Sequence, residues 1–345
     1  MRPVLTLSAR RLWRDQTTLQ LGHGTPRAAV LAGVDSSIRA TLALLDGTRT
    51  SEQLIASAQS VGCTPARLRH LLDLLGSTGL LDDASEDRTV LQPLTPAERQ
   101  RLGADLGSLA LVRGDGGLPA ARYRHPARVL VIGAGRVGAP LATMLAMAGI
   151  GAVDVLDEAA TQPEDTGAGG LELSDVGRSR GLAARERLRR STPSMKQASP
   201  ADADLVVLAP GRPDQLDDAR RLISPGVPHL LAEVRGSVGV VGPLVLPGRS
   251  ACLRCLDLTR TDLDPQWPSV AAQLASPSRT REACDGPLAV MVAAQAAQQV
   301  LSLVDGTTDP ASVGGTLELA LPDWRWRRRT WPIHPACGCA LPAAG

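Results

Sequence analysis

Two close pairs of cysteines constrain the fold of this chain more than any other feature. Cys252 and Cys255 form a C-x-x-C motif, and Cys337 and Cys339 form a C-x-C motif close to the C-terminus. Four thiolates in two pairs suit tetrahedral Zn²⁺, which takes sulfur ligands at about 2.3 Å. We therefore predict one structural zinc ion that ties the C-terminus to an earlier part of the same domain. His334 lies just before the second motif and is the alternative ligand, ranked below the four cysteines.

The expected compartment and partners follow from composition. The chain has six cysteines in 345 residues, and its first 18 residues contain no apolar stretch like that of a signal peptide. Reduced thiols in the cytoplasm are therefore expected, and metal binding is favoured over disulfides. The net charge of +2 gives no reason to expect nucleic acid or an anionic membrane as a partner. The most apolar segment, residues 288–304, carries three glutamines and is predicted to be a buried helix.

A glycine-rich turn precedes both cysteine motifs. It joins a predicted strand at residues 129–132 to a predicted helix at residues 139–148, which is the context that a G-x-G-x-x-G motif requires. The first glycine makes the tight turn, the second lets the backbone approach phosphate, and the third lets the helix pack on the strand. A carboxylate at the end of the next strand can accept hydrogen bonds from ribose hydroxyls. The predicted nucleotide-site residues are Gly133, Gly135, Arg136, Gly138 and Asp157.

The chain divides into three segments by its pattern. Residues 127–345 alternate short apolar runs with helical stretches, which predicts an α/β domain with a Rossmann-like, doubly wound parallel sheet. The strand candidates of this domain are residues 129–132, 153–156, 205–208 and 229–234. Residues 91–126 contain one helix start followed by glycine and proline, and they are predicted to be a linker.

Residues 1–90 have the pattern of a small winged helix-turn-helix domain. Strands are predicted at residues 4–7 and 19–21, and helices at residues 36–45, 51–58 and 64–75. The second helix opens with a capping box formed by Thr50 and Gln53. Residues 79–81 are predicted to begin a wing strand after the third helix.

The order of motifs in residues 127–340 resembles the ThiF family of ubiquitin-activating-type adenylyltransferases. Its landmarks are the glycine turn, Asp157, the Asp-Val-Gly run at 175–177, residues 248–255, and Cys284 followed by a Gly-Pro pair. A dehydrogenase is the usual interpretation of such a turn, but the cysteine pairs disfavour it. The resemblance implies activation of a C-terminal carboxylate with ATP and Mg²⁺, and a two-fold homodimer.

This chain departs from that family pattern where charge must be neutralised. Family members carry an Asp two positions after the ribose carboxylate, an Asn-x-x-Arg segment, a Lys after the Asp-Val/Ile-Gly run and a later Asp. The corresponding residues here are Ala159, Asp165 with Ala168, Arg180, and Gly211 or, in a shifted register, Asp214. Glu158 could hold Mg²⁺ only if its strand slipped by one residue, which would also reverse its direction. Because these stabilising charges are mostly absent, we expect a catalytically degenerate site in which Arg180 remains a candidate nucleotide contact.

Cys284 is the only catalytic candidate, and it is a weak one. It matches the region where sulfur-handling relatives carry a reactive cysteine, and nearby arginines could lower its pKa. An inert thiol is the more common case and is the favoured interpretation.

A winged module fused to a degenerate ThiF-like domain resembles the ThiF-like partner proteins of YcaO cyclodehydratases. In those systems the N-terminal module resembles PqqD and binds a precursor leader peptide as an added strand. Here residues 4–7 and 19–21 would offer the sheet edge, and residues 64–75 the groove. We therefore predict a scaffold that presents a peptide to a YcaO-type enzyme. The alternative is an active ATP-dependent adenylyltransferase. For the N-terminal module, packing or dimerisation alone remains open, and DNA binding is disfavoured by the near-neutral charge.

Overall fold

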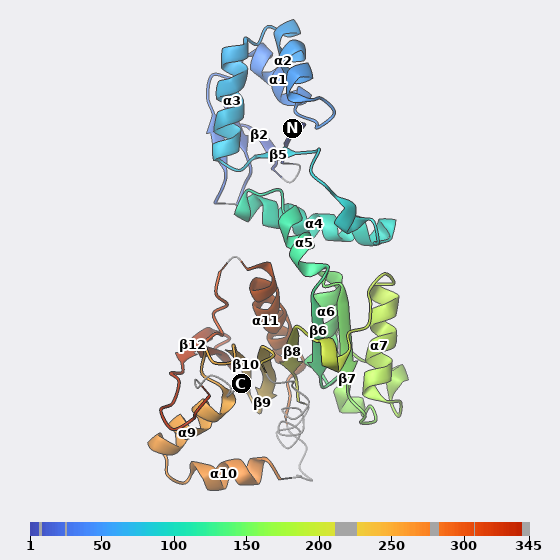
Figure 1. Cartoon of the computed structure of the whole chain (residues 1–345), viewed down its shortest axis with the longest axis vertical. Coiled ribbons are helices and arrows are strands. Elements are labelled where there is room, and N and C mark those ends of the chain that lie inside the picture. Colours follow the sequence, from blue (N-terminus) through green and yellow to red (C-terminus); the bar gives the residue numbers. More distant parts are fainter. Residues whose placement is uncertain (7–8, 25, 211–225, 277–282, 307, 340–345) are drawn as a thin grey trace. The chain divides into compact units, whose positions relative to one another are not determined.

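The computed structural model describes residues 1–6, 9–24, 26–210, 226–276, 283–306 and 308–339, drawn in colour in Figure 1. The chain forms two compact units, Met1–Tyr123 and Arg124–Gly345. Each unit has its own hydrophobic core.

The first unit contains a three-stranded antiparallel sheet in the order β2 (Arg11–Trp13), β3 (Leu19–Leu21), β4 (Ala29–Leu31). A separate antiparallel pair joins β1 (Pro3–Leu5) to β5 (Leu81–Asp83). Strands β1, β3 and β5 therefore form where they were expected. The residues predicted to begin a wing pair with the N-terminal strand, and they are not followed by a second hairpin strand in the described part of the chain.

Three helices follow β4, and each begins at a polar N-cap. They are α1 (Ser36–Leu44), α2 (Ser51–Ser60) and α3 (Pro65–Ser77), capped by Asp35, Thr50 and Thr64. Both halves of the predicted capping box form, since the Thr50 side chain accepts from the Gln53 backbone and the Gln53 side chain accepts from the Thr50 backbone. Apolar residues at helical spacing, such as Leu68, Leu71 and Leu75, pack against the sheet and bury the core.

The segment expected to be a linker is largely helical. It holds η1 (Thr89–Leu91), α4 (Pro96–Arg113) and α5 (Leu118–Arg124). Its apolar residues recur every fourth position at Leu102, Leu106 and Ala110, so α4 buries one face. Only the start of this helix was predicted from the sequence, although the periodicity continues through residue 110.

The second unit is built on a seven-stranded mixed sheet in the order β12-β11-β10-β9-β8-β6-β7. The parallel strands are β6 (Arg128–Ile132), β7 (Ala152–Leu156), β8 (Leu205–Leu208) and β9 (His229–Arg235). These are the four strands that the sequence predicted. An antiparallel extension follows, formed by β10 (Val238–Val245), β11 (Gly315–Ala320) and β12 (Trp326–Thr330). The expectation of a wholly parallel sheet is therefore corrected to a mixed one.

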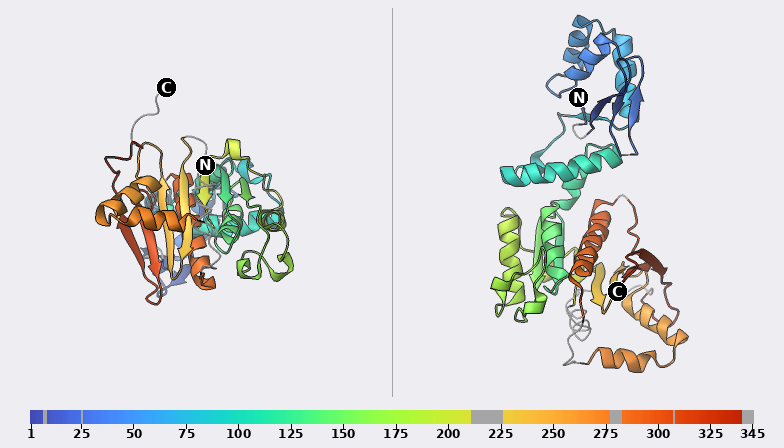
Figure 2. Two further views of the ribbon diagram at one scale, coloured as in Figure 1. Left: turned by 90° about the horizontal axis from the view of Figure 1, so that it is seen from below. Right: turned by 180° about the vertical axis from the view of Figure 1, so that it is seen from behind.

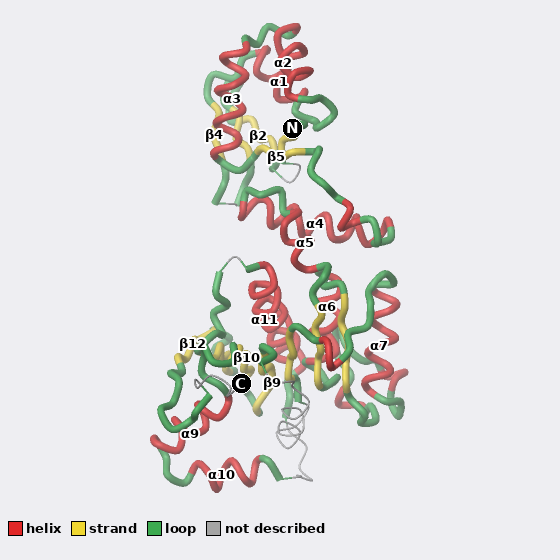
Figure 3. Tube along the Cα trace, in the orientation of Figure 1, coloured by secondary structure: helices red, strands yellow, loops and turns green. Residues whose placement is uncertain are grey.

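Helices flank this sheet, as the two views in Figure 2 and the trace in Figure 3 show. In the described residues of this unit the α-helices are α6 (Gly138–Met147), α7 (Arg180–Ser191), α9 (Leu253–Leu263), α10 (Trp267–Leu274) and α11 (Gly286–Asp305). Short 3₁₀ turns lie at η2 (Pro163–Asp165), η3 (Leu173–Asp175) and η4 (Pro200–Asp202). Helix α11 has the length and composition of a membrane span, but half of its most apolar window is buried inside the unit. It packs against α6, β9 and β10, as predicted for a buried helix.

Candidate functional site

The four paired cysteines come together at one end of the second unit. Cys252 is the N-cap residue of α9 and Cys255 lies in its first turn, whereas Cys337 and Cys339 follow β12. The Sγ atom of Cys252 lies 3.8 Å from that of Cys255 and 3.4 Å from that of Cys337, and the Cys255–Cys339 separation is 3.4 Å. All four sulfurs lie within 4.8 Å of one another. A tetrahedral ion with 2.3 Å bonds would hold sulfurs about 3.8 Å apart, so the cluster fits a zinc ion.

Burial opposes ionisation of three thiols of the cluster when no cation is bound. Burial opposes ionisation of Cys255, but backbone N–H groups of His334 and Cys252 lower its pKa to about 7. Burial raises the pKa of Cys337 and of Cys339. A divalent cation would therefore be needed to hold all four as thiolates, and it would compete with protons for them.

His334, the alternative ligand, is engaged elsewhere. Its Nε2 atom lies 2.8 Å from a carboxylate oxygen of Asp262, and its Nδ1 atom accepts from the backbone N–H of Ala336 at 3.1 Å. Both ring nitrogens therefore have partners outside the sulfur cluster. The four cysteines form a complete ligand set without it.

The glycine turn has the close approaches that were predicted for its first and third glycines. Gly133 has φ of +102°, and a Cβ atom there would lie 2.0 Å from the Ala209 carbonyl oxygen. A Cβ atom at Gly138 would lie 1.9 Å from the Gly133 carbonyl oxygen. Both positions therefore admit only glycine. Helix α6 begins at Gly138, and no side chain in the described part of the chain caps it, which leaves backbone donors at its N-terminus.

Asp157 follows β7 and faces the glycine turn. Its Oδ2 atom accepts from the Ala134 backbone N–H at 2.8 Å, and its Oδ1 atom accepts from the Ala159 backbone N–H at 3.0 Å. The strand pairs in register up to its last residue, Leu156, opposite Ile132. Asp157 therefore lies directly after the strand that follows the glycine turn, where the sequence placed the ribose-binding carboxylate. The one-residue slip that would have brought Glu158 to this place does not occur.

Arg180 forms a buried ion-pair network with two carboxylates. Its Nη2 atom lies 3.0 Å from Oδ2 of Asp157, and its Nη1 atom lies 3.0 Å from Oδ1 of Asp165. The side chains of Arg180 and Asp157 are each only 8% exposed. The Arg180 Nε atom is buried and has no hydrogen-bond partner among the described residues. The Asp157 carboxylate is thus satisfied by internal donors.

The ion pair between Arg180 and Asp165 was not predicted from the sequence. The family pattern has a neutral Asn and a Lys at the positions of Asp165 and Arg180. The Asn-to-Asp change adds a second carboxylate beside Asp157, and the two Nη atoms of an Arg can each donate to one of them, whereas a Lys offers a single nitrogen. Both residues of the pair differ from the family pattern, and this joint difference was the sequence signal that could have revealed the ion pair.

Arg136 connects the glycine turn to the segment that holds Cys284. Its Nε atom donates to the Thr166 carbonyl at 3.2 Å, and its Nη1 atom donates to the Cys284 carbonyl at 2.6 Å. Cys284 is half-buried and forms a β-bridge with Gly236. The structure therefore brings the Cys284 backbone to the glycine turn. Ala159 and Ala168 are exposed, and Gly211 and Asp214 lie outside the described residues.

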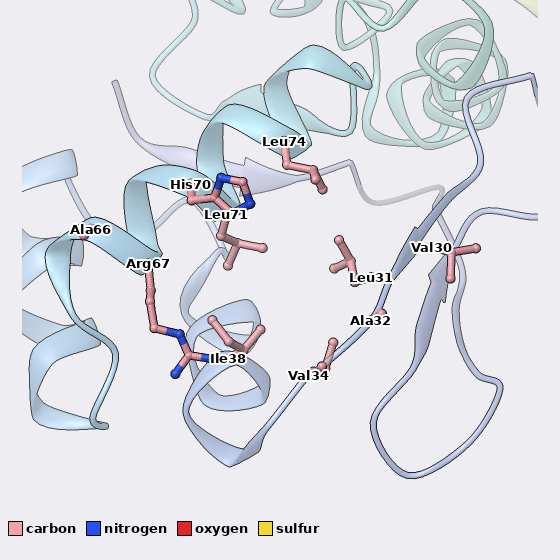
Figure 4. Close-up of a pocket in the computed structure, with 11 residues that line it drawn as sticks. Val30, Leu31, Ala32, Val34, Ile38, Ala66, Arg67, His70, Leu71 and Leu74 are labelled. Carbon is pink, nitrogen blue, oxygen red and sulfur yellow. The ribbon is translucent and has the colours of Figure 1, made fainter.

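A second candidate site lies in the first unit, where α3 faces β4 (Figure 4). The pocket has a volume of about 450 Å³. One wall is α3, which the sequence predicted as the groove. The other wall is β4 and residues 32–34, whereas β3 is the central strand of its sheet and cannot offer the predicted edge.

A Rossmann-like sheet with a glycine turn and a C-terminal cysteine cluster defines an adenylyltransferase-like α/β protein. The chain belongs to the ThiF family, whose sequence profile matches residues 114–340. No curated protein sequence matches the chain.

Solved structures match the fold over 94–99% of this chain. E. coli MccB with ATP is 15% identical with a TM-score of 0.71, covering 98% of this chain and 99% of that chain. The microcin C7 biosynthetic enzyme MccB in complex with N-formylated MccA is 15% identical with a TM-score of 0.71. The match covers 99% of this chain and 100% of that chain. PaaA is 19% identical with a TM-score of 0.68, and the match covers 94% of this chain and 99% of that chain. At these identities the likeness concerns the fold.

Proposed function

We propose that this protein binds a precursor leader peptide through its N-terminal unit and presents it to a YcaO-type cyclodehydratase, without activating a carboxylate itself. The observation that carries the proposal is the composition around Asp157, where alanines and an internal ion pair occupy the positions that need charged groups for adenylation. In this scheme residues 1–90 are a winged, PqqD-like peptide-recognition domain. Residues 127–345 are a zinc-stapled ThiF-like scaffold in the cytoplasm.

Adenylation would have to overcome the repulsion between two anions, a carboxylate and a polyphosphate. Enzymes offset such charge with positioned donors and cations. Ala159 and Ala168 offer none, and the Arg180 guanidinium is already shared between Asp157 and Asp165. Ribose hydroxyls could reach Asp157 only by competing with Arg180 for the same oxygens. These features support a retained scaffold over a working adenylation site.

The proposed peptide binding rests on the pocket between α3 and β4 and on the similarity of the fold to MccB. MccB has been crystallised with N-formylated MccA, which supports a peptide ligand for a protein of the same fold. Strand addition needs only a free sheet edge and a groove beside it. The terminal strand β4 and the helix α3 supply both.

Zinc in this scheme is structural. Cys252, Cys255, Cys337 and Cys339 would fill all four positions of a tetrahedral ion, which leaves none open for a substrate. The ion would then contribute folding free energy and no chemistry.

The second candidate function is an ATP-dependent adenylyltransferase. It is favoured by the uncapped N-terminus of α6 at the glycine turn, since such a terminus binds phosphate. MccB has also been crystallised with ATP. Gly133, Gly135, Arg136 and Gly138 would hold the phosphates, Mg²⁺ would offset their charge, and ATP would supply the adenylyl group.

ATP–pyrophosphate exchange separates the two functions. With the purified chain and synthetic peptides or ubiquitin-like proteins that end in a free carboxylate, we expect no exchange above background, because the stabilising charges are absent. Any weak ATP binding measured by calorimetry should be abolished by Gly135→Val, which obstructs the backbone's approach to phosphate. Robust exchange that disappears in Asp157→Ala would restore the adenylyltransferase.

The scaffold is also expected to be a closed two-fold dimer, the commonest form of soluble oligomer. Light scattering at micromolar concentration should give twice the chain mass of 36.0 kDa. A mass of one chain across that range would remove the dimer from the proposal.

A further inference from the structure

The pocket of the first unit has an apolar lining and one basic end. Its larger apolar residues come from both walls and are Val30, Leu31, Val34, Ile38, Leu71 and Leu74. In Figure 4, Leu31, Val34 and Ile38 point toward the gap that α3 closes from the other side. The basic end is formed by Arg67 and His70, which lie on the same face of α3 as Leu71 and Leu74. The two ends of the pocket therefore offer different chemistry.

Strand β4 offers a pairing edge beside this pocket. It is the last strand of its sheet, and Val30 on it is 49% exposed. Val30 also borders the pocket, but in Figure 4 its side chain points away from α3, whereas Leu31, only 8% exposed, points toward the gap, so successive side chains alternate in direction. A peptide paired along β4 would place every second side chain over the apolar lining.

The Arg67 guanidinium has N–H groups at the basic end that can still bind a ligand. Its contacts among the described residues run through Nη1, which lies 2.9 Å from Oδ2 of Asp35 and 3.2 Å from Oγ of Ser37. Asp35 is the N-cap of α1, and the backbone N–H of Ile38, the Ser37 hydroxyl and Arg67 hold its pKa well below the ordinary range. The negative charge of Asp35 is therefore already met by several donors. The Nε and Nη2 atoms of Arg67 form an edge that can receive a carboxylate with two parallel hydrogen bonds.

We infer that this pocket selects an extended peptide segment with apolar side chains at alternate positions and an acidic side chain at the Arg67 end. The inference rests on the proposed peptide-binding function and names the class of sequence that the site reads. Arg67 and Leu74 are about 10 Å apart along α3. A strand advances about 3.3 Å per residue, so the acidic residue lies two to four positions from the apolar anchor.

Selection of random decapeptides displayed against the immobilised full-length chain tests the inference. We expect enriched peptides to carry two apolar residues separated by one position, with Asp or Glu two to four residues away. Leu74→Asp, which puts a charge into the apolar end, should lose the enrichment.

Fluorescence anisotropy on an enriched peptide then measures the acidic contact. Replacing its Asp or Glu by the matching amide should weaken binding about fivefold, the upper range for an exposed ion pair. Arg67→Gln should remove the difference between the acid and the amide. Arg69→Gln, on the same helix but outside the pocket, should retain it.

The outcomes separate this inference from the proposed function. Peptides that enrich and bind without any acidic preference would overturn the inference and leave peptide binding intact. Enrichment that survives Leu74→Asp would place the peptide elsewhere and would also overturn it. No enrichment at all would overturn peptide binding by the protein, and the inference with it.

Discussion

Replacing Cys252 and Cys337 together by serine is expected to release the metal and unfold the C-terminal part of the second unit. Structural zinc sites contribute apparent binding free energies of about 10–16 kcal/mol at neutral pH. Whole domains are stable by only about 5–15 kcal/mol. Loss of two of the four thiolates should therefore remove a contribution comparable to the total stability.

The structure gives a physical reason for this dependence. The core beside the cysteines is small and consists of Ala251, Cys255, Leu256, Trp331 and Cys337. Two of its five buried members are themselves predicted ligands, so little apolar area remains to hold α9 against the end of the chain.

Elemental analysis and fluorescence check the prediction. The unchanged protein should hold about one zinc per chain, and the double variant should hold none. Trp331 is only 5% exposed and donates to the Thr316 hydroxyl at 3.0 Å, so its emission should shift to the red when the cluster opens. Cys284→Ser is the matched control and should keep the zinc. A double variant that retains a full equivalent of zinc would contradict the assignment of these cysteines.

The parts of the fold that the sequence predicted are those with local signals. The glycine turn lies between an apolar run and a helix, and Gly133 and Gly138 have no room for a side chain. The capping box at Thr50 fixes the start of α2 through contacts three residues apart. The two cysteine pairs were predicted to lie together because a tetrahedral zinc site needs four ligands, even when these are up to 85 positions apart in sequence.

The parts that escaped prediction depend on contacts between distant residues. Strands β10 and β11 extend the sheet as antiparallel neighbours, and this arrangement is set by their pairing with strands that are distant in sequence or run in the opposite direction. The free edge beside α3 is β4, whose three residues carry no alternation long enough to detect. The Arg180 network joins residues that are separate in sequence, so its effect on Asp157 could be found only in three dimensions.

Asp305→Asn is expected to destabilise the second unit by about 3–5 kcal/mol, because it leaves a buried arginine without its counter-charge. Arg124 donates to Asp305 through Nε at 2.8 Å and Nη2 at 2.7 Å, and through Nη1 to the Ala148 carbonyl at 3.1 Å. The side chains of Arg124 and Asp305 are 5% and 1% exposed. The pair therefore ties the first residue of the unit to the ends of α6 and α11.

The measurement is the urea midpoint of the variant, with the slope of the transition unchanged. Arg128 and Asp204 provide the matched control, since they form the same type of pair with side chains 46% and 49% exposed. Arg128→Met should cost no more than about 1 kcal/mol, because solvent already screens that pair. The double change of Arg124→Met with Asp305→Leu removes both buried charges and should recover most of the loss, since an apolar pair of similar volume needs no desolvation. A loss in Asp305→Asn no larger than the loss in Arg128→Met would mean that the buried pair does not hold this end of the unit.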